Sequence, residues 1–239
     1  MSLQLEICAA SLASALAAQA GGAHRIELCQ NLEQGGTTPS YGLIKEVMAQ
    51  LRIPVFVLIR PRPGGFVYSP GELAIMRADI ELCRSLGCAG VVLGVLDAAG
   101  RVDVAQCQAL AALAQPMEVT FHRAFDACAD QFQALEEVVT IGCQRILTSG
   151  GQPSATAGRD RLAALVAQAA GRVRIMPGAG ITAANLQNLV AHIGAQDFHA
   201  SAKRTVPPVL ADGLFQAELL ETDATLVAGL VAQLQPAAR

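Results

Sequence analysis

The stretch LQLEICAASLASALAAQAGGAHRIELC, from Leu3 to Cys29, contains one complete strand–helix–strand unit. Apolar residues alternate with other types over Leu3–Cys8 and again over Arg25–Cys29, and this spacing of two predicts strands. The Ala- and Leu-rich run between them begins at Ser11 and ends before two glycines, as a helix does. The chain therefore opens with a βα unit followed by the strand of the next one.

The same pattern continues almost to the end of the 239 residues. Eight short β-rich runs alternate with longer amphipathic runs, and we expect strands over Leu3–Cys8, Arg25–Cys29, Pro54–Arg60, Gly90–Leu96, Met117–His122, Arg145–Ser149, Val173–Gly178 and Asp197–Ser201, with a last helix near Ala224–Leu234. Eight such units predict a TIM-type (β/α)8 barrel that spans residues 1–239 as a single domain. Irregular segments after strands are expected at Arg62–Gly71 and Lys203–Phe215.

A doubly wound open sheet is the alternative fold. It normally has fewer strands and a Gly-rich dinucleotide turn after the first one. Here that turn reads CAASLAS, without GxGxxG. The barrel is therefore favoured, and no nucleotide cofactor is indicated.

Composition limits the classes of partner. The net charge of -3 and the 4% aromatic content give little attraction for nucleic acid. No apolar stretch approaches the roughly 20 residues of a membrane helix, and the first ten residues lack the basic region of a secretory signal. Seven cysteines with no CxxC pair suggest neither a disulfide framework nor a structural zinc site. We expect a cytoplasmic protein without nucleic-acid or membrane partners.

Strand parity sorts the side chains of the predicted barrel, because alternate residues of each strand face the helices and must be apolar. The remaining residues face inward and are unusually polar. They predict one connected layer made of Glu6, Glu27, Arg60, Glu118 and His122. Buried carboxylates need counter-ions, and Arg60 is expected to supply one, with Arg25, Arg123 or Arg145 as further candidates. Cys8 and Cys29 also face inward by parity. They end the first two predicted strands, one layer above Glu6 and Glu27.

Glycine-rich turns follow the sixth and seventh predicted strands, as TSGG at Thr148–Gly151 and PGAGI at Pro177–Ile181. Backbone N–H groups of such turns hold phosphate in many barrels, although glycines also make ordinary tight βα turns. Arginine forks can hold phosphate or carboxylate. The residues predicted to bind an anion are Arg60, Arg62, Ser149, Gly150, Gly178, Gly180, His199 and Ser201.

Six motifs together resemble one known family over nearly the whole chain: LEICAAS, GGAHRIELCQNLEQGGTTPSYG, VFVLIRPRPGGFVYS, VTFHRAFD, RILTSGG and IMPGAGI. They are similar to the CutC copper-homeostasis family. The resemblance implies a TIM-type barrel, a cytoplasmic location, frequent homo-oligomers and a role in handling copper. It places Cys8 and Cys29 at the proposed copper ligands.

Two functions therefore stay open. The first is Cu(I) binding by Cys8 and Cys29, since Cu(I) is soft and accepts as few as two thiolates. The second is an enzyme acting on a small phosphorylated or carboxylated metabolite, with Glu27, Glu118 and His122 as catalytic residues and Arg60 as the anion clamp. A barrel that serves only as an assembly scaffold is a weaker third interpretation.

Overall fold

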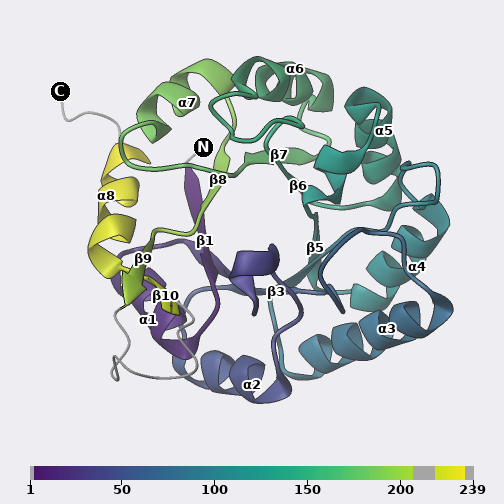
Figure 1. Cartoon of the computed structure of the whole chain (residues 1–239), viewed down its shortest axis with the longest axis horizontal. Coiled ribbons are helices and arrows are strands. Elements are labelled where there is room, and N and C mark those ends of the chain that lie inside the picture. Colours follow the sequence, from purple (N-terminus) through teal and green to yellow (C-terminus); the bar gives the residue numbers. More distant parts are fainter. Residues whose placement is uncertain (1–2, 207–218, 235–239) are drawn as a thin grey trace, which may run out of the picture.

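Eight parallel strands form a nearly closed barrel inside a ring of helices, as the computed structural model of residues 3–206 and 219–234 shows (Figure 1). The barrel strands are β1 Gln4–Ala9, β2 Arg25–Leu28, β3 Val55–Leu58, β4 Gly90–Leu93, β5 Glu118–Phe121, β6 Arg145–Thr148, β7 Arg174–Pro177 and β8 Asp197–Ala200. From β1 to β7 each strand pairs with the next one along the chain, and β8 pairs with β1. The predicted TIM-type barrel is confirmed.

Eight α-helices are described, and each follows its strand as the repeat predicts. They are α1 Leu12–Ala20, α2 Tyr41–Gln50, α3 Pro70–Ser85, α4 Val104–Ala114, α5 Gln131–Ile141, α6 Arg159–Ala169, α7 Leu186–Ile193 and α8 Ala224–Leu234. Short 3-10 helices, η1 Leu32–Gln34 and η2 Arg123–Ala127, follow β2 and β5. In the parts of the chain described, no helix has both the length and the apolar character needed to cross a membrane.

Local sequence fixes where these helices begin. Ser11 caps α1 by accepting a hydrogen bond from the Ser14 N–H at 3.0 Å. At α3 a capping box joins Ser69 and Glu72, with Pro70 at the first helical position. Side-chain caps therefore define the start of each of these two helices, close behind the strand end at α1 and after a longer loop at α3.

The predicted strand parity is confirmed by the division of the core. Outward residues such as Leu5, Ile7 and Ile26 pack in one large apolar cluster with the helices. A separate, smaller cluster inside the barrel joins Cys8, Cys29, Phe56, Leu58 and Val92. The polar residues of opposite parity share this interior.

Ion pairs neutralise the deepest interior charges. Nε of Arg25 lies 2.6 Å from Glu6, and its Nη2 lies 2.7 Å from Asp197. All three side chains are almost fully buried, with exposed fractions of 6%, 0% and 1%. Arg145 pairs with Glu118 and approaches Asp197 at 3.7 Å. The predicted counter-ion roles of Arg25 and Arg145 are confirmed.

An aromatic ring lies beside this network inside the barrel. Phe56 lies between two guanidinium groups, 5.7 Å from Arg25 and 4.9 Å from Arg145. A Cβ on Gly90 of the neighbouring strand would come within 2.1 Å of this ring, so the position requires glycine. Beneath the ring a hollow of about 270 Å³ at the N-terminal ends of the strands shares no lining residue with the cavity at the opposite end.

The register of the first two strands differs from the prediction by two residues. Glu6 lies opposite Arg25, and Cys8 lies opposite Glu27. Placing Glu6 beside Glu27 was wrong, because a closed barrel requires neighbouring strands to be staggered. The stagger gives Glu6 a cation as its neighbour in place of a second carboxylate.

One predicted loop also contains a strand. Within the segment Lys203–Phe215, β9 Lys203–Val206 pairs antiparallel with β10 Leu219–Thr222, next to α8. The rest of that predicted loop lies outside the described residues. The segment Arg62–Gly71 is irregular up to Ser69, the N-cap of α3, which begins at Pro70.

We expect Arg25→Met to lower the free energy of unfolding by about 3–5 kcal/mol, because it leaves Glu6 and Asp197 buried with one counter-ion fewer. Urea unfolding followed by circular dichroism measures this. The matched control is Arg52→Met, at an exposed position, which should stay within about 0.5 kcal/mol of the parent. Equal midpoints for the two variants would contradict the buried network.

Candidate functional site

A cavity of about 720 Å³ opens at the C-terminal ends of the barrel strands. This is the end at which (β/α)8 barrels carry their sites. The cavity brings together most, but not all, of the residues predicted from the sequence. Those that line it are Cys8, Glu27, Cys29, Arg60, His122, Gly180, His199 and Ser201. Five others do not line it: Arg62, Glu118, Ser149, Gly150 and Gly178.

The two cysteines lie side by side in the cavity wall. Sγ of Cys8 is 3.4 Å from Sγ of Cys29, at the distance of a thiol–thiol hydrogen bond. Both side chains are buried, and neither is part of a disulfide. The hydrogen bond to Cys29, together with burial, raises the pKa of the Cys8 thiol. Cys8 is therefore a neutral thiol near pH 7.

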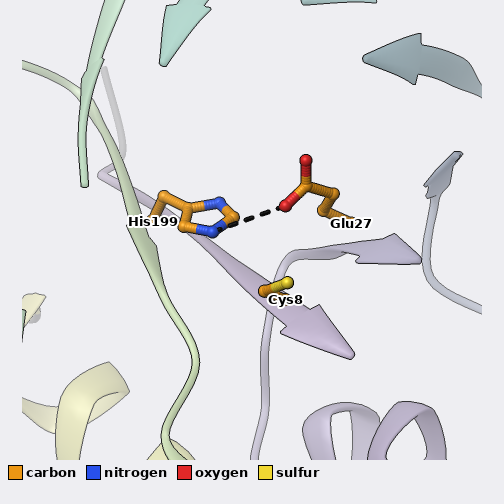
Figure 2. Close-up of side chains that lie close together, drawn as sticks. All are labelled: Cys8, Glu27 and His199. Atoms are coloured by element: carbon orange, nitrogen blue, oxygen red, sulfur yellow. Dashed lines mark ion pairs between the residues drawn. The ribbon is translucent and has the colours of Figure 1, made fainter. Parts of the chain in front are cut away.

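Glu27 and His199 join Cys8 from the two neighbouring strands. Figure 2 shows the Glu27 carboxylate facing the His199 ring, with Cys8 beside them. Nε2 of His199 is 3.5 Å from Glu27, and one ligand-type atom of each of the three residues lies within 4.8 Å of the others. A thiol, a carboxylate and an imidazole thus converge on one point of the cavity.

Glu6 orients His199 from below. Nδ1 of His199 donates to the Glu6 carboxylate at 2.8 Å, which fixes the ring so that Nε2 faces Glu27. Burial opposes a charge on this imidazole, but the hydrogen bond to Glu6 and the charge of Glu27 outweigh it and raise the His199 pKa. Burial also opposes ionisation of Glu6, yet Arg25 and His199 bring the Glu6 pKa down to about 2.

Glu27 behaves differently from Glu6. Burial raises its pKa, and the attraction of His199 offsets this only in part. Glu6 has Arg25 as a direct cationic partner, whereas Glu27 has a longer contact to His199 and a hydrogen bond with the Cys8 thiol. Of the two buried glutamates, the one at the cavity is thus the easier to protonate.

His122 stands at another part of the cavity wall, where β5 ends. Its Nδ1 accepts a hydrogen bond from the Ala124 N–H at 3.2 Å and so caps η2. A Cβ at Gly94 would come within 2.6 Å of this nitrogen, so glycine is needed for the ring to fit. Burial, helped by the charge of Arg60, lowers the His122 pKa to about 3. The ring is therefore neutral, with its proton on Nε2.

Arg60 is buried, but its role as a counter-ion of the glutamates is a wrong prediction. Its Nη1 donates to the carbonyls of Gln34 and Gly36, at 3.2 and 2.7 Å, and its Nη2 donates to the carbonyl of Gly64 at 2.7 Å. These bonds tie two loops to the rim of the barrel. The cause is position: Arg60 follows β3 at the rim, whereas the buried acids are lower in the barrel.

The TSGG turn is already occupied by a carboxylate of the protein. Asp126 accepts hydrogen bonds from the N–H groups of Ser149 and Gly151, each at 3.0 Å, and from the Thr148 hydroxyl. Arg123 pairs with the same carboxylate at 2.8 Å, rather than with a barrel glutamate. The prediction that Ser149 and Gly150 offer this turn to an external anion does not fit, because Asp126 fills the place of that anion.

Three other predicted residues also have different roles. Arg62 pairs with Glu72 and donates to carbonyls of its own loop. Gly178 uses its N–H on the Thr148 carbonyl at 3.0 Å. Glu118 has the predicted inward parity but begins β5, so it lies at the opposite end of the barrel beside Arg145. The single polar layer predicted from parity is therefore divided between the two ends.

Sequence reasoning missed Asp126, Asp197 and Phe66. The parity rule could have found Asp197, which lies two residues before His199 on β8 and faces the same way. Asp126 lies in VTFHRAFD, but no spacing rule shows that its carboxylate reaches the turn after the next strand. Phe66 contacts both Arg60 and His122 from a loop, which no strand pattern predicts.

Comparison with known proteins gives the family. A sequence model of the CutC family matches residues 3–204. The chain belongs to the CutC family. It is 55% identical to a CutC family protein of Xylella fastidiosa over 206 residues, which cover 86% of this chain and 77% of the relative. It is also 48% identical to the human copper homeostasis protein cutC homolog over 201 residues, 84% of this chain and 74% of that protein.

Solved structures agree with the family and the fold. The CutC crystal structure from Streptococcus agalactiae superposes with a TM-score of 0.79 at 37% identity, covering 82% of this chain and 97% of that one. Thiamine phosphate pyrophosphorylase from Pyrococcus furiosus gives a TM-score of 0.63 at 13% identity over 97% of this chain and 95% of its own. That second likeness concerns the fold alone.

We expect Asp126→Asn to cost about 1–3 kcal/mol of unfolding free energy, because charge-assisted hydrogen bonds from the TSGG turn weaken. Asp130→Asn is the control. Asp130 caps α5, and asparagine caps a helix as well as aspartate does. Urea unfolding compares the two variants, and a cost at Asp130 as large as that at Asp126 would show that the turn has no special need for the carboxylate.

We expect the imidazole of His122 to remain neutral from pH 8 to pH 5, with Nε2 protonated, as measured by nitrogen-15 NMR. The folded pKa of His122 is below its usual value of 6.5, so between these two values the unfolded chain binds a proton that the native chain does not bind. Stability should therefore fall as the pH drops from 6.5 towards 3, and less so in His122→Gln. A His122 midpoint above pH 5 would contradict the neutral ring.

Proposed function

We propose that the chain binds Cu(I) through the thiolates of Cys8 and Cys29 at the mouth of the barrel. The single observation that carries this proposal is the 3.4 Å separation of the two sulfur atoms in the wall of an open cavity. Cu(I) prefers soft sulfur ligands and low coordination numbers, so a neighbouring thiol pair is sufficient. The name of the human relative agrees with this at the level of the family.

The surroundings of the thiols define how copper would bind. His199 and Glu27 each offer a further ligand atom next to Cys8. Each thiol must lose its proton on binding, because the thiolate is the ligand. The site would thus take up the metal and release protons into a pocket that contains a carboxylate and an imidazole. Cytoplasmic location and assembly into homo-oligomers remain predictions of the family resemblance.

We expect Cys8→Ser and Cys29→Ser each to lose at least about tenfold in Cu(I) affinity, since serine keeps the size but removes a soft ligand. The measurement is a competition titration against a Cu(I) chelator under reducing, oxygen-free conditions. Cys107→Ser is the matched control: this buried thiol on α4 donates to the Val95 carbonyl, a bond that a serine hydroxyl can also make.

Unfolding midpoints of all three variants establish that they are folded. If Cys8→Ser and Cys29→Ser bind Cu(I) like the parent, the copper proposal is wrong. If Cys107→Ser loses as much affinity as they do, the loss reflects general damage and not a ligand, and the assignment to this pair is equally wrong.

A second candidate function is favoured by the cavity itself. Its volume of about 720 Å³ is in the range of small-molecule sites and far exceeds what one metal ion needs. Of the three residues predicted to be catalytic, Glu27 and His122 line it and Glu118 does not. Binding, and then turnover, of a small anionic metabolite is the function that these residues support. Thermal-shift measurements with phosphorylated and carboxylated metabolites test it, because a ligand of the native state raises the unfolding temperature.

A further inference from the structure

Arg60 differs from the other buried arginines of the described chain. Arg25 and Arg145 each contact carboxylates. Arg60 contacts backbone carbonyls, the Tyr68 hydroxyl and the ring of Phe66, 5.1 Å from its guanidinium carbon, and no carboxylate among the described residues. It is only 6% exposed. A buried cation without a counter-ion is costly, and an anionic ligand would relieve this cost. The cavity wall therefore carries one positive charge that the described residues leave unmatched.

Two hydrogen-bond donors near this charge have no partner among the described residues. They are Nε of Arg60 and Nε2 of His122, both buried. Nδ1 of His122 faces Gly94 and the Ala124 N–H, so its Nε2 edge points away from them. Buried polar groups in native proteins are nearly always satisfied, so two orphan donors on one cavity wall indicate that something else completes them.

Phe66 links the two donors. Its ring centroid lies 4.9 Å from that of His122, and Arg60 stacks on the same ring. Phe66 is partly exposed and lines the cavity. The ring thus lies against both side chains, so a ligand that reaches the two nitrogen atoms would also contact Phe66. A change at Phe66 is therefore a direct report of binding at this place.

The unmatched groups suit a carboxylate better than a phosphate. The TSGG amides that could hold a phosphate are bonded to Asp126, and Arg62 is bonded to Glu72. Arg123 and Lys203 also line the cavity, but both are exposed and Arg123 is paired with Asp126. One buried charge and two donors match the single charge and two oxygen atoms of a carboxylate.

The remaining wall suits an apolar body. Ile181, together with Leu226 and Leu230 of α8, lines the same cavity. Leu226 is 48% exposed, so it offers apolar surface to a ligand in this cavity. A ligand that fills this space would cover Leu226 with its apolar body while its polar group reaches Arg60 and His122.

We infer that the cavity binds a small monocarboxylic acid with an apolar body, whose carboxylate pairs with Arg60 and accepts a hydrogen bond from Nε2 of His122. This inference rests on the second candidate function and names its ligand class. It does not depend on copper.

Isothermal titration calorimetry with 3-phenylpropionate, phenyl phosphate and 3-phenylpropan-1-ol tests the ligand class, in copper-free reducing buffer at constant ionic strength. We expect saturable binding of the carboxylate, and binding at least about tenfold weaker for the uncharged alcohol, which cannot pair with Arg60. The phosphate should also bind more weakly. Equal binding of the alcohol, or tighter binding of the phosphate, would overturn the assignment.

Paired variants test the two residues. His122→Asn keeps a cap for the Ala124 N–H but has no group at the Nε2 position, whereas His122→Gln carries a donor closer to that position. We expect about a tenfold loss of carboxylate affinity in the first and partial recovery in the second. Arg60→Lys should lose affinity, while Arg62→Lys, two residues away and bonded to its own loop, should bind like the parent. Equal effects at positions 60 and 62 would place the carboxylate elsewhere.

The chain contains no tryptophan, so Phe66→Trp introduces a unique fluorophore beside both donors. Its emission should change on titration with 3-phenylpropionate and saturate at the affinity found by calorimetry. Calorimetric binding without any change in emission would mean that the acid binds away from Phe66, and the inference would fail. Because every arm is free of copper, failure of the copper proposal leaves this test standing. If the acid binds but is not converted, the enzyme proposal is wrong and the assignment of the binding site stands.

Discussion

The contact between Arg25 and Glu6 determines much of the chemistry at the barrel mouth. With Arg25 as its partner, Glu6 keeps its charge although it is fully buried, and the charged carboxylate then holds His199 by Nδ1. The ring so held turns its other nitrogen to Glu27, next to the thiol of Cys8. Glu6 does not line the cavity, yet it determines which nitrogen of His199 faces the cavity. Second partners of this kind commonly orient imidazole ligands and catalytic histidines.

Two kinds of chemistry share one cavity wall. Cys8, Glu27 and His199 lie on the adjacent strands β1, β2 and β8, and Cys29 directly follows β2. Arg60 and His122 follow β3 and β5. A soft metal and an organic acid would therefore use different residues of the same space. Binding of one could alter binding of the other without any shared ligand atom, by charge and by volume alone, and such coupling is reciprocal.

The barrel and the cavity residues Cys8, Glu27 and His199 were accessible from sequence because strand parity is local: each alternate residue faces inward whatever the neighbouring strand does. The position of a side chain along the barrel axis is not a local property of its strand. It depends on the stagger between strands, which is why Glu118 was expected at the mouth and lies at the opposite end. Contacts made by loops were the least predictable. The carboxylate of Asp126 fills a turn that begins 22 residues later, and Arg60 bonds to carbonyls of two loops.

The position of Phe56 bears on how ligands enter and leave the barrel. The ring, next to two guanidinium groups and against Gly90, lines the hollow at one end of the barrel, and this hollow shares no lining residue with the cavity at the other end. No described residue thus lines a passage from one space to the other. Whatever enters the cavity, ion or acid, has to leave by the route through which it came, so an occupant near the opening delays the exit of anything that arrived before it. The residence time of a ligand in such a cavity depends on the order in which the ligands bind as well as on their affinities.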